Sequence, residues 1–227
     1  MKRHSRLLLC AAALAGLAAG GAEAAPLVVR SAGPSAKSFP PGRVLPDKAP
    51  VALKAGDMVT VLLPGGSRVL RGPGTFTVGG GASAASFNPR GRFGAMRAGE
   101  VPMSPSLWDV DVSQSGRVCL ADLKAVTLWR PEKDEAVTVT IAGPGAAERK
   151  VEWAGGKDIL AWPAAVPIDE GTEYRVSWTG NDDPTKLSFV ALPTVPEDRP
   201  GLAKALIDRQ CQSQFDLLID TSPSAEP

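Results

Sequence analysis

The feature that most limits the fold of this chain is a series of short segments, from about residue 106 to 195, in which apolar and polar residues alternate. Val137, Val139 and Ile141 alternate with threonines, and Tyr174 and Val176 flank an arginine. Such alternation gives each strand one buried and one solvated face. Turn-forming clusters separate the segments: Gln114-Ser115-Gly116, Gly143-Pro144-Gly145, Gly155-Gly156 and Gly180 to Pro184. The pattern predicts an antiparallel, immunoglobulin-like sandwich of about seven or eight strands.

A second β pattern lies between residues 25 and 80. Met58 to Leu63 is rich in large apolar residues, Pro64 to Ser67 can form a tight turn, and Arg68 to Arg71 predicts the returning strand. Gly72-Pro73-Gly74 then ends the pairing, because Pro73 cannot donate to a ladder. These glycines open a strand and no Gly-Lys-Ser/Thr follows, so we reject a phosphate-binding loop. The sequence therefore predicts a mainly β chain with a small β unit ahead of the sandwich.

The small unit contains a set of turn and strand residues with a recognisable spacing. The set is Pro46-Asp47, then Val51, Leu53, Ala55-Gly56-Asp57 and Val59-Thr60-Val61, then Gly66, Arg68-Val69-Leu70 and Gly72-Pro73-Gly74. It resembles the FecR-type β domain of bacterial periplasmic proteins, over about residues 27–80. FecR proteins proper are transmembrane regulators that relay a signal to a sigma factor. Here the resemblance implies a fold and a compartment rather than that regulatory role.

The first 24 residues have the three parts of a secretory signal peptide. Lys2, Arg3 and Arg6 form a positive region, an apolar run follows from residue 7 to 19, and Ala22-Glu23-Ala24 fits a small-x-small cleavage site. We predict cleavage after Ala24 and a periplasmic or secreted protein, with a retained N-terminal anchor as the alternative. No other stretch is long and apolar enough to cross a bilayer, so we predict no membrane insertion after the signal is removed.

Two cysteines remain after such a cleavage, Cys119 and Cys211. In an oxidising compartment an even pair favours a disulfide, which here would be worth roughly 4 kcal/mol in the chain-entropy model. Two buried thiols or a redox pair are the alternatives, although the Cys-x-x-Cys spacing of redox motifs is missing.

Several catalytic chemistries lack their residues in this sequence. The single histidine is His4, inside the predicted signal, which excludes Ser-His-Asp and Cys-His catalysis in the mature chain. The stretch from Asp109 to Gly116 has a misplaced glycine for a calcium loop, and Leu120 stands where its glutamate would be. The acidic pairs Asp169-Glu170 and Asp182-Asp183 leave a carboxylate hydrolase as the less favoured alternative. We predict a non-enzymatic protein without metal or cofactor.

Residues 81–105 form a Gly- and Arg-rich linker or loop. Arg90, Arg92 and Arg97 are interspersed with Phe87 and Phe93, which makes this segment a candidate surface for a partner or an anion. A solvated linker, or a loop lying on the sandwich, is the alternative. The formal net charge of +1 gives no reason to expect nucleic acid as a ligand.

All five tryptophans fall in the predicted sandwich. At alternating apolar positions we interpret them mainly as core residues, whereas an exposed tryptophan face would favour binding of carbohydrate or cell wall.

The C-terminal part changes from strand to helix character. Leu202, Leu206, Cys211, Phe215 and Leu218 recur at helical spacing and predict one amphipathic helix over residues 196–220, followed by a flexible tail over 221–227. A Cys119–Cys211 bridge would tie this helix to the sandwich. The sequence as a whole predicts a protein-binding or sensing/scaffold module of the cell envelope, whose partner is another envelope protein and whose oligomeric state stays open.

Overall fold

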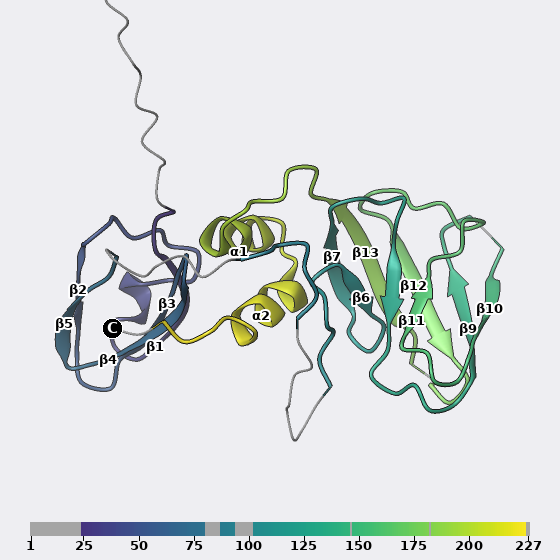
Figure 1. Cartoon of the computed structure of the whole chain (residues 1–227), viewed down its shortest axis with the longest axis horizontal. Coiled ribbons are helices and arrows are strands. Elements are labelled where there is room, and N and C mark those ends of the chain that lie inside the picture. The colour runs from purple at the N-terminus through teal and green to yellow at the C-terminus, as the bar shows by residue number, and fades with distance from the viewer. Residues whose placement is uncertain (1–23, 80–86, 94–101, 146, 182, 226–227) are drawn as a thin grey trace, which may run out of the picture.

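The computed structural model describes residues 24–79, 87–93, 102–145, 147–181 and 183–225. Over these residues the chain is mainly β, with several antiparallel sheets and two C-terminal helices, so the predicted fold class is confirmed. Figure 1 shows two β units with the helices between them. In the described part, no helix is long and apolar enough to span a membrane. The predicted signal lies outside the described residues, apart from Ala24 at its cleavage site.

The N-terminal β unit, residues 24–79, consists of two small sheets and one short 3-10 helix. The elements are β1 (Leu27–Ala32), η1 (Ala36–Ser38), β2 (Pro50–Leu53), β3 (Met58–Leu63), β4 (Gly66–Arg71) and β5 (Gly74–Thr77). One sheet has the order β1-β3-β4 and the other pairs β2 with β5, all antiparallel. Between them lies the N-terminal cluster, to which Val28, Val59, Val61 and Leu70 contribute. The predicted hairpin is thus the β3–β4 pair.

A buried carboxylate holds two loops of this unit together. Asp57 Oδ1 accepts a hydrogen bond from the backbone N–H of Ser35 at 2.8 Å, and its Oδ2 accepts one from that of Lys54 at 2.6 Å. Burial by itself raises the pKa of Asp57, but the hydrogen bonds from Ser35 and Lys54 and the charge of Lys54 outweigh it. The pKa of Asp57 therefore lies below its ordinary value of 3.8.

The sandwich unit, residues 102–192, has two sheets over one hydrophobic core. Its strands are β6 (Asp109–Asp111), β7 (Gly116–Leu120), β8 (Thr127–Trp129), β9 (Val137–Ala142), β10 (Arg149–Trp153), β11 (Ile159–Ala161), β12 (Glu173–Trp178) and β13 (Thr185–Ala191). The sheet orders are β10-β9-β12-β13-β7 and β11-β8-β6. Apolar residues of both sheets form the sandwich cluster, which includes Val110, Leu128, Ile141, Val176 and Phe189.

Two strand pairs in this unit are parallel, a detail that the antiparallel prediction missed. β13 pairs with β7, and β6 pairs with β8, both in parallel register. In the sequence, β7 lies near the start of the unit and β13 near its end. β6 and β8 are connected by residues 112–126, which include β7 of the other sheet. Alternation within a strand specifies which face is buried but not the direction of the neighbouring strand.

The C-terminal helical segment is two helices rather than the predicted one. α1 spans Arg199–Asp208 and α2 spans Gln212–Asp220. α1 begins where the Asp198 side chain accepts a hydrogen bond from the N–H of Gly201 at 2.6 Å, with Pro200 in the first turn. It ends before Gln210, whose φ of 61° breaks the helix. This break places Cys211 at the start of α2, facing the sandwich.

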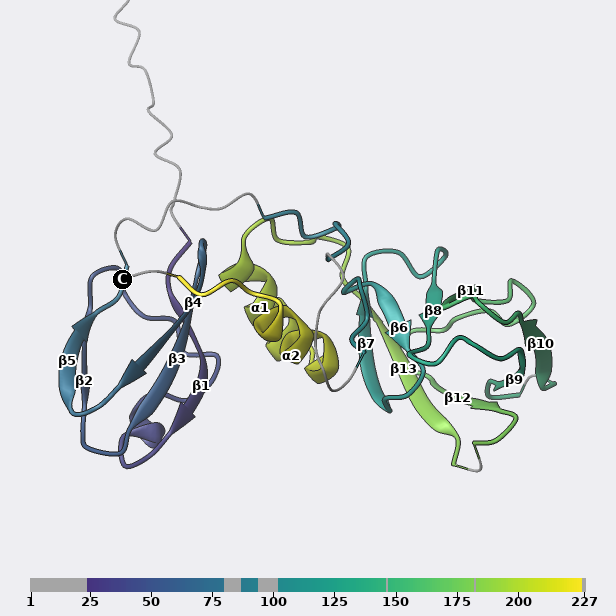
Figure 2. The same cartoon turned by 60° about the horizontal axis from the view of Figure 1, so that its bottom comes forward.

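The two helices, which we call the helix pair, lie between the β units in both views (Figures 1 and 2). Their apolar sides form the central cluster with residues from both units. This cluster takes Leu27, Val29 and Leu62 from the N-terminal unit, Leu107, Cys119 and Leu192 from the sandwich unit, and Leu202, Ala203, Leu206, Cys211, Phe215, Leu218 and Ile219 from the helical segment. The helix pair therefore joins the two units through one shared core.

The described part of the C-terminal tail, residues 221–225, is bonded to the N-terminal unit. After α2 it returns to the N-terminal unit, where Ser224 forms a parallel β-bridge with Ser67 of β4 (Figure 2). The backbone N–H of Ser67 donates to the carbonyl oxygen of Pro223 at 2.8 Å, and that of Ala225 donates to the carbonyl oxygen of Ser67 at 2.7 Å. These two hydrogen bonds place the tail along the edge of β4.

Candidate functional site

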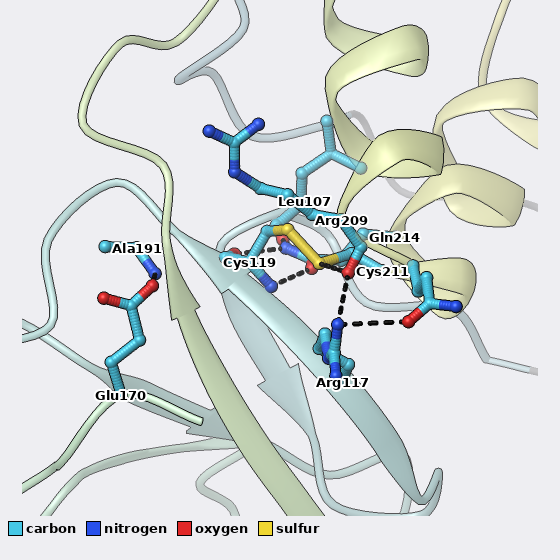
Figure 3. The surroundings of a disulfide bond; sticks show 9 residues. Leu107, Arg117, Cys119, Glu170, Ala191, Arg209, Cys211 and Gln214 are labelled. Atoms are coloured by element: carbon cyan, nitrogen blue, oxygen red, sulfur yellow. Dashed lines mark hydrogen bonds between the residues drawn. A yellow bond between two sulfur atoms is a disulfide. The ribbon is translucent and has the colours of Figure 1, made fainter. Parts of the chain in front are cut away.

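The predicted disulfide between Cys119 and Cys211 is present. Cys119 lies on β7 and Cys211 between the two helices, with an S–S distance of 1.98 Å and a Cα–Cα distance of 5.8 Å (Figure 3). Both cysteines are fully buried in the central cluster. The bridge spans 92 positions of sequence and fixes the helix pair against the edge strand of the larger sheet.

Beside the disulfide, the side-chain amide of Gln214 binds the backbone of the sandwich unit (Figure 3). Its Oε1 accepts a hydrogen bond from the N–H of Cys119 at 2.6 Å, and its Nε2 donates to the carbonyl oxygens of Leu107 and Cys119 at 2.6 and 2.7 Å. Gln214 is buried, so all three bonds are shielded from water. Sequence reasoning missed this residue, although a glutamine among the apolar residues Cys211, Phe215 and Leu218 is a signal for it.

A further contact fixes the break between the helices. Arg117 of β7 donates from Nη1 to the carbonyl oxygen of Arg209 at 3.3 Å and to Oε1 of Gln210 at 3.1 Å (Figure 3). A carbonyl at the end of α1 thus receives a cationic donor, which suits the negative end of a helix dipole. Together with Cys211 and Gln214, this arginine makes β7 the main attachment of the helix pair.

The other face of the helix pair is attached through Arg199, the first residue of α1. Its Nη1 donates to the carbonyl oxygen of Pro64, in the β3–β4 turn, at 2.7 Å. Its guanidinium also lies 4.5 Å from the ring centroid of Phe87. Burial lowers the pKa of Arg199, yet a guanidinium stays charged at neutral pH. One side chain therefore connects α1 to the N-terminal unit and to the linker.

The described part of the Arg- and Phe-containing loop, residues 87–93, packs against the central cluster. Phe87 and Phe93 both contact the central cluster, and the N–H of Phe93 donates to the carbonyl oxygen of Pro105. The indole Nε1 of Trp108 donates to the carbonyl oxygen of Pro89 at 2.7 Å. Of the predicted partner-binding residues, then, the two phenylalanines face inward.

The three arginines of this loop differ in their surroundings. Arg90 and Arg92 are both exposed, and Arg92 also forms an ion pair with Asp109, with 3.1 Å between Nη1 and Oδ2. Arg97 lies outside the described residues. Of the four predicted residues that the structure describes, Arg90 and Arg92 remain exposed to a partner or an anion, whereas the phenylalanines do not.

Asp109 itself is buried, at the start of β6. Its Oδ1 accepts a hydrogen bond from the hydroxyl of Thr127 at 2.6 Å, while Oδ2 is paired by charge with Arg92 but accepts no well-aligned hydrogen bond. The parallel pairing of β6 with β8 places Asp109 opposite Thr127, which explains its burial.

A pocket of about 140 Å³ lies between β6, β7 and α2. Four carboxylates line it, those of Asp109, Asp111, Asp216 and Asp220. Each one already has a partner: Asp111 accepts hydrogen bonds from Ser113 and Gln114, and Arg30 contacts both Asp216 and Asp220. The described residues contain no group of three or more His, Cys, Asp or Glu side chains placed to hold a metal. We assign no chemistry to this pocket.

The first acidic pair considered for a hydrolase, Asp169-Glu170, lies in the loop before β12. Glu170 accepts a hydrogen bond from the N–H of Ala191 at 2.9 Å, and the N–H of Asp169 donates to the hydroxyl of Tyr174. Both contacts stabilise the turn before β12. In the second pair, Asp182 lies outside the described residues. The N–H of Asp183 donates to the side chain of Asn181, in the turn before β13.

None of the five tryptophans is fully exposed. Trp153 and Trp129 are buried, and Trp108, Trp162 and Trp178 are partly buried and pack against a cluster. The Trp162 ring meets those of Tyr174 and Phe189 edge-on at centroid distances of 5.4 and 5.2 Å. This packing agrees with their interpretation as mainly core residues, and binding of carbohydrate or cell wall through tryptophans stays a prediction.

Exposed large apolar side chains occur instead on the N-terminal unit. Among the described residues they are Val44, Met58 and Val69. Met58 lies opposite Arg71 and Thr60 opposite Val69 in the β3–β4 pair, so Met58 and Val69 are on the same face of this hairpin. That face is the clearest exposed apolar surface of the described chain.

A scan against protein-family models and searches of curated proteins and of solved structures find no match to this chain.

Proposed function

We propose that this chain is a non-enzymatic, exported protein of the bacterial cell envelope that binds another envelope protein. In this proposal the sandwich unit and the N-terminal unit are held in a fixed relation by the helix pair, and the N-terminal unit offers the binding surface. The similarity of residues 27–80 to FecR-type periplasmic domains supports the compartment and the use of the small β unit.

The observation on which the proposal mainly rests is the central cluster with its disulfide. A buried Cys119–Cys211 bridge suits an oxidising compartment, where such bonds persist. The cluster joins residues from near both ends of the described chain, from Leu27 to Ile219. A joint built in this way holds two modules rigidly, which is useful to a scaffold because a pre-ordered surface loses less entropy on binding.

Site-specific photo-crosslinking in intact cells tests the proposal. A photoreactive residue at Val69, on the exposed face, should give a crosslink to an envelope protein. The same residue at Lys150, which is exposed on β10 of the sandwich unit, is the matched control and should give none. In parallel, fractionation and mass spectrometry should find an exported chain that begins at Ala25 and whose cysteines are oxidised. A cytoplasmic chain with free thiols, or equal crosslinks from both positions, would overturn the proposal.

A further inference from the structure

The outer edge of β4 already holds an extended chain. Ser67 is bonded on both of its backbone groups to the residues on either side of Ser224, at 2.8 and 2.7 Å. This pattern, one residue bonded to two neighbours of its partner, is that of a parallel β-ladder. The tail segment 223–225 therefore occupies the edge as an added strand would.

Gly66 makes this close approach possible. A Cβ atom at position 66 would lie 2.2 Å from the carbonyl oxygen of Pro223 and 3.0 Å from its carbonyl carbon. A side chain there would push the tail away from Ser67. The lack of a side chain at Gly66 therefore lets an extended backbone lie directly against the start of β4.

The tail is attached to α2 by a separate set of contacts. The hydroxyl of Thr221 donates to the carbonyl oxygen of Leu217 at 2.6 Å, and that of Ser222 donates to the carbonyl oxygen of Leu218 at 2.7 Å. These bonds cap the end of α2 and do not involve β4. The segment after Ser222 can consequently leave the edge while the helix keeps its caps.

The edge continues beyond the bonds that the tail makes. β4 extends to Arg71, and alternate residues of a strand direct their backbone groups to the same side. Val69 and Arg71 therefore direct theirs to the same edge as Ser67. Strand edges of this kind are where peptides add to sheets, with the backbone giving affinity and alternate side chains giving specificity.

We infer that the β4 edge is a strand-acceptor site, held by the tail within the chain and taken over by an extended segment of the partner protein. The identity of this occupant as an envelope protein rests on the proposed function. The segment that fits has a small residue opposite Gly66, an apolar side chain over Met58 and Val69, and carboxylates for Arg68 and Arg71. In the described part of the chain those two arginines form no salt bridge, and their contacts are to the carbonyl oxygen of Thr77 and the sulfur of Met58.

A peptide-binding experiment tests the acceptor site. The probe is a labelled synthetic peptide of residues 221–227, added to the complete exported chain and to a chain that ends at Ser222. The shortened chain should bind the peptide at least tenfold more tightly, with changes in the amide NMR signals of Ser67 and Val69. Equal binding to both chains would overturn the inference.

Two variants of the shortened chain separate backbone pairing from other contacts. Ser67→Pro removes the N–H that bonds the tail and should weaken peptide binding at least tenfold. Ser67→Ala keeps that N–H and should bind as the parent does. Amide protection of β3 shows whether each variant is folded, and peptide binding that survives Ser67→Pro in a folded chain would rule out the β4 edge.

Crosslinking from Val69 in cells then identifies the occupant. Removal of residues 223–227 should raise the yield of the same envelope-protein crosslink that the complete chain gives. If the shortened chain instead crosslinks to its own copies and dimerises in solution, the occupant is a second copy and the partner assignment is wrong. Peptide binding without any envelope crosslink would uphold the acceptor edge but overturn both the partner and the proposed function.

Discussion

The sandwich cluster and the central cluster are both fully buried, but they are assembled in different ways. The buried residues of the sandwich cluster all lie between Val110 and Phe189, and the strands and connecting loops of one unit supply them. The central cluster joins Leu27 to Ile219 and needs three separate parts of the chain. Closing such long loops costs more conformational entropy than pairing neighbouring strands. The central cluster should therefore depend more strongly on individual cross-links and buried hydrogen bonds.

The largest expected effect is that of the disulfide. The double variant Cys119→Ala and Cys211→Ala should lower the free energy of unfolding of the helix pair by about 4 kcal/mol, because the open chain regains its loop entropy. Amide exchange in α2 should become faster by roughly a thousandfold, while exchange in β12 of the sandwich changes little. Equal acceleration in both elements would show that the two clusters unfold as one unit, and that the central cluster does not depend more strongly on the disulfide.

The next largest effect should come from Gln214. Gln214→Ala leaves the N–H of Cys119 and the carbonyl groups of Leu107 and Cys119 buried without partners, and should cost about 3 kcal/mol of unfolding free energy. Urea unfolding at neutral pH measures this loss. Gln212→Ala, at an exposed position on the same helix, is the matched control and should change stability by less than about 0.5 kcal/mol. Similar losses in the two variants would mean that helix propensity, not the buried amide, decides the result.

A smaller effect is expected on the side of the N-terminal unit. Arg199→Ala removes the hydrogen bond to Pro64 and the contact with Phe87, and should cost about 2 kcal/mol. Exchange should accelerate at α1 and at the β3–β4 turn. Lys204→Ala, which loses only an exposed ion pair with Asp208, serves as the control and should have little effect. If amide exchange in β7 accelerates as much as in the β3–β4 turn, Arg199 stabilises the contacts of the helix pair with both units and not only those with the N-terminal unit.

The smallest expected effect is a pH dependence confined to the N-terminal unit. Because the pKa of Asp57 is lower in the folded state, its carboxylate stabilises this unit at pH values above about 4 and loses that contribution as the pH falls through the folded-state pKa. Asp57→Asn should destabilise the unit at neutral pH, and the difference from the unchanged chain should shrink in acid. Amide exchange of β3 as a function of pH measures it. A difference that stays constant from pH 7 to pH 3 would contradict this role of the carboxylate.

The strands were largely predictable because each one is specified by residues close together in sequence. The β3–β4 hairpin follows from a run of apolar residues, a Pro-Gly-Gly turn and a returning strand, and the alternation around Val139 and Val176 identifies two strands of the sandwich. The disulfide could be predicted as well, since export and an even number of cysteines favour it. Whether the Phe87–Phe93 segment serves a partner stays a prediction, but its phenylalanines turned out to pack inward.

The helix break and the candidate binding edge could not be found in this way. Helical spacing continues through Gln210, so periodicity alone predicts one helix, and the break is visible only where Cys211 must reach Cys119. Gln214 and Arg199 have ordinary local surroundings in the sequence, and their partners lie 95 and 135 positions away. The pairing of the tail with Ser67 likewise joins residues that share no local pattern.

By itself the sequence determined the mainly β class, the two β units and the cysteine pair, because short-range alternation and turn residues limit the backbone locally. The tertiary structure alone decided the parallel pairings, the division of the C-terminal segment into α1 and α2, the shared central cluster and the occupied edge of β4. These features depend on which distant segments meet. Burial of apolar surface and the need of buried polar groups for partners decide which segments meet. Residues that are neighbours along the chain do not determine either of them.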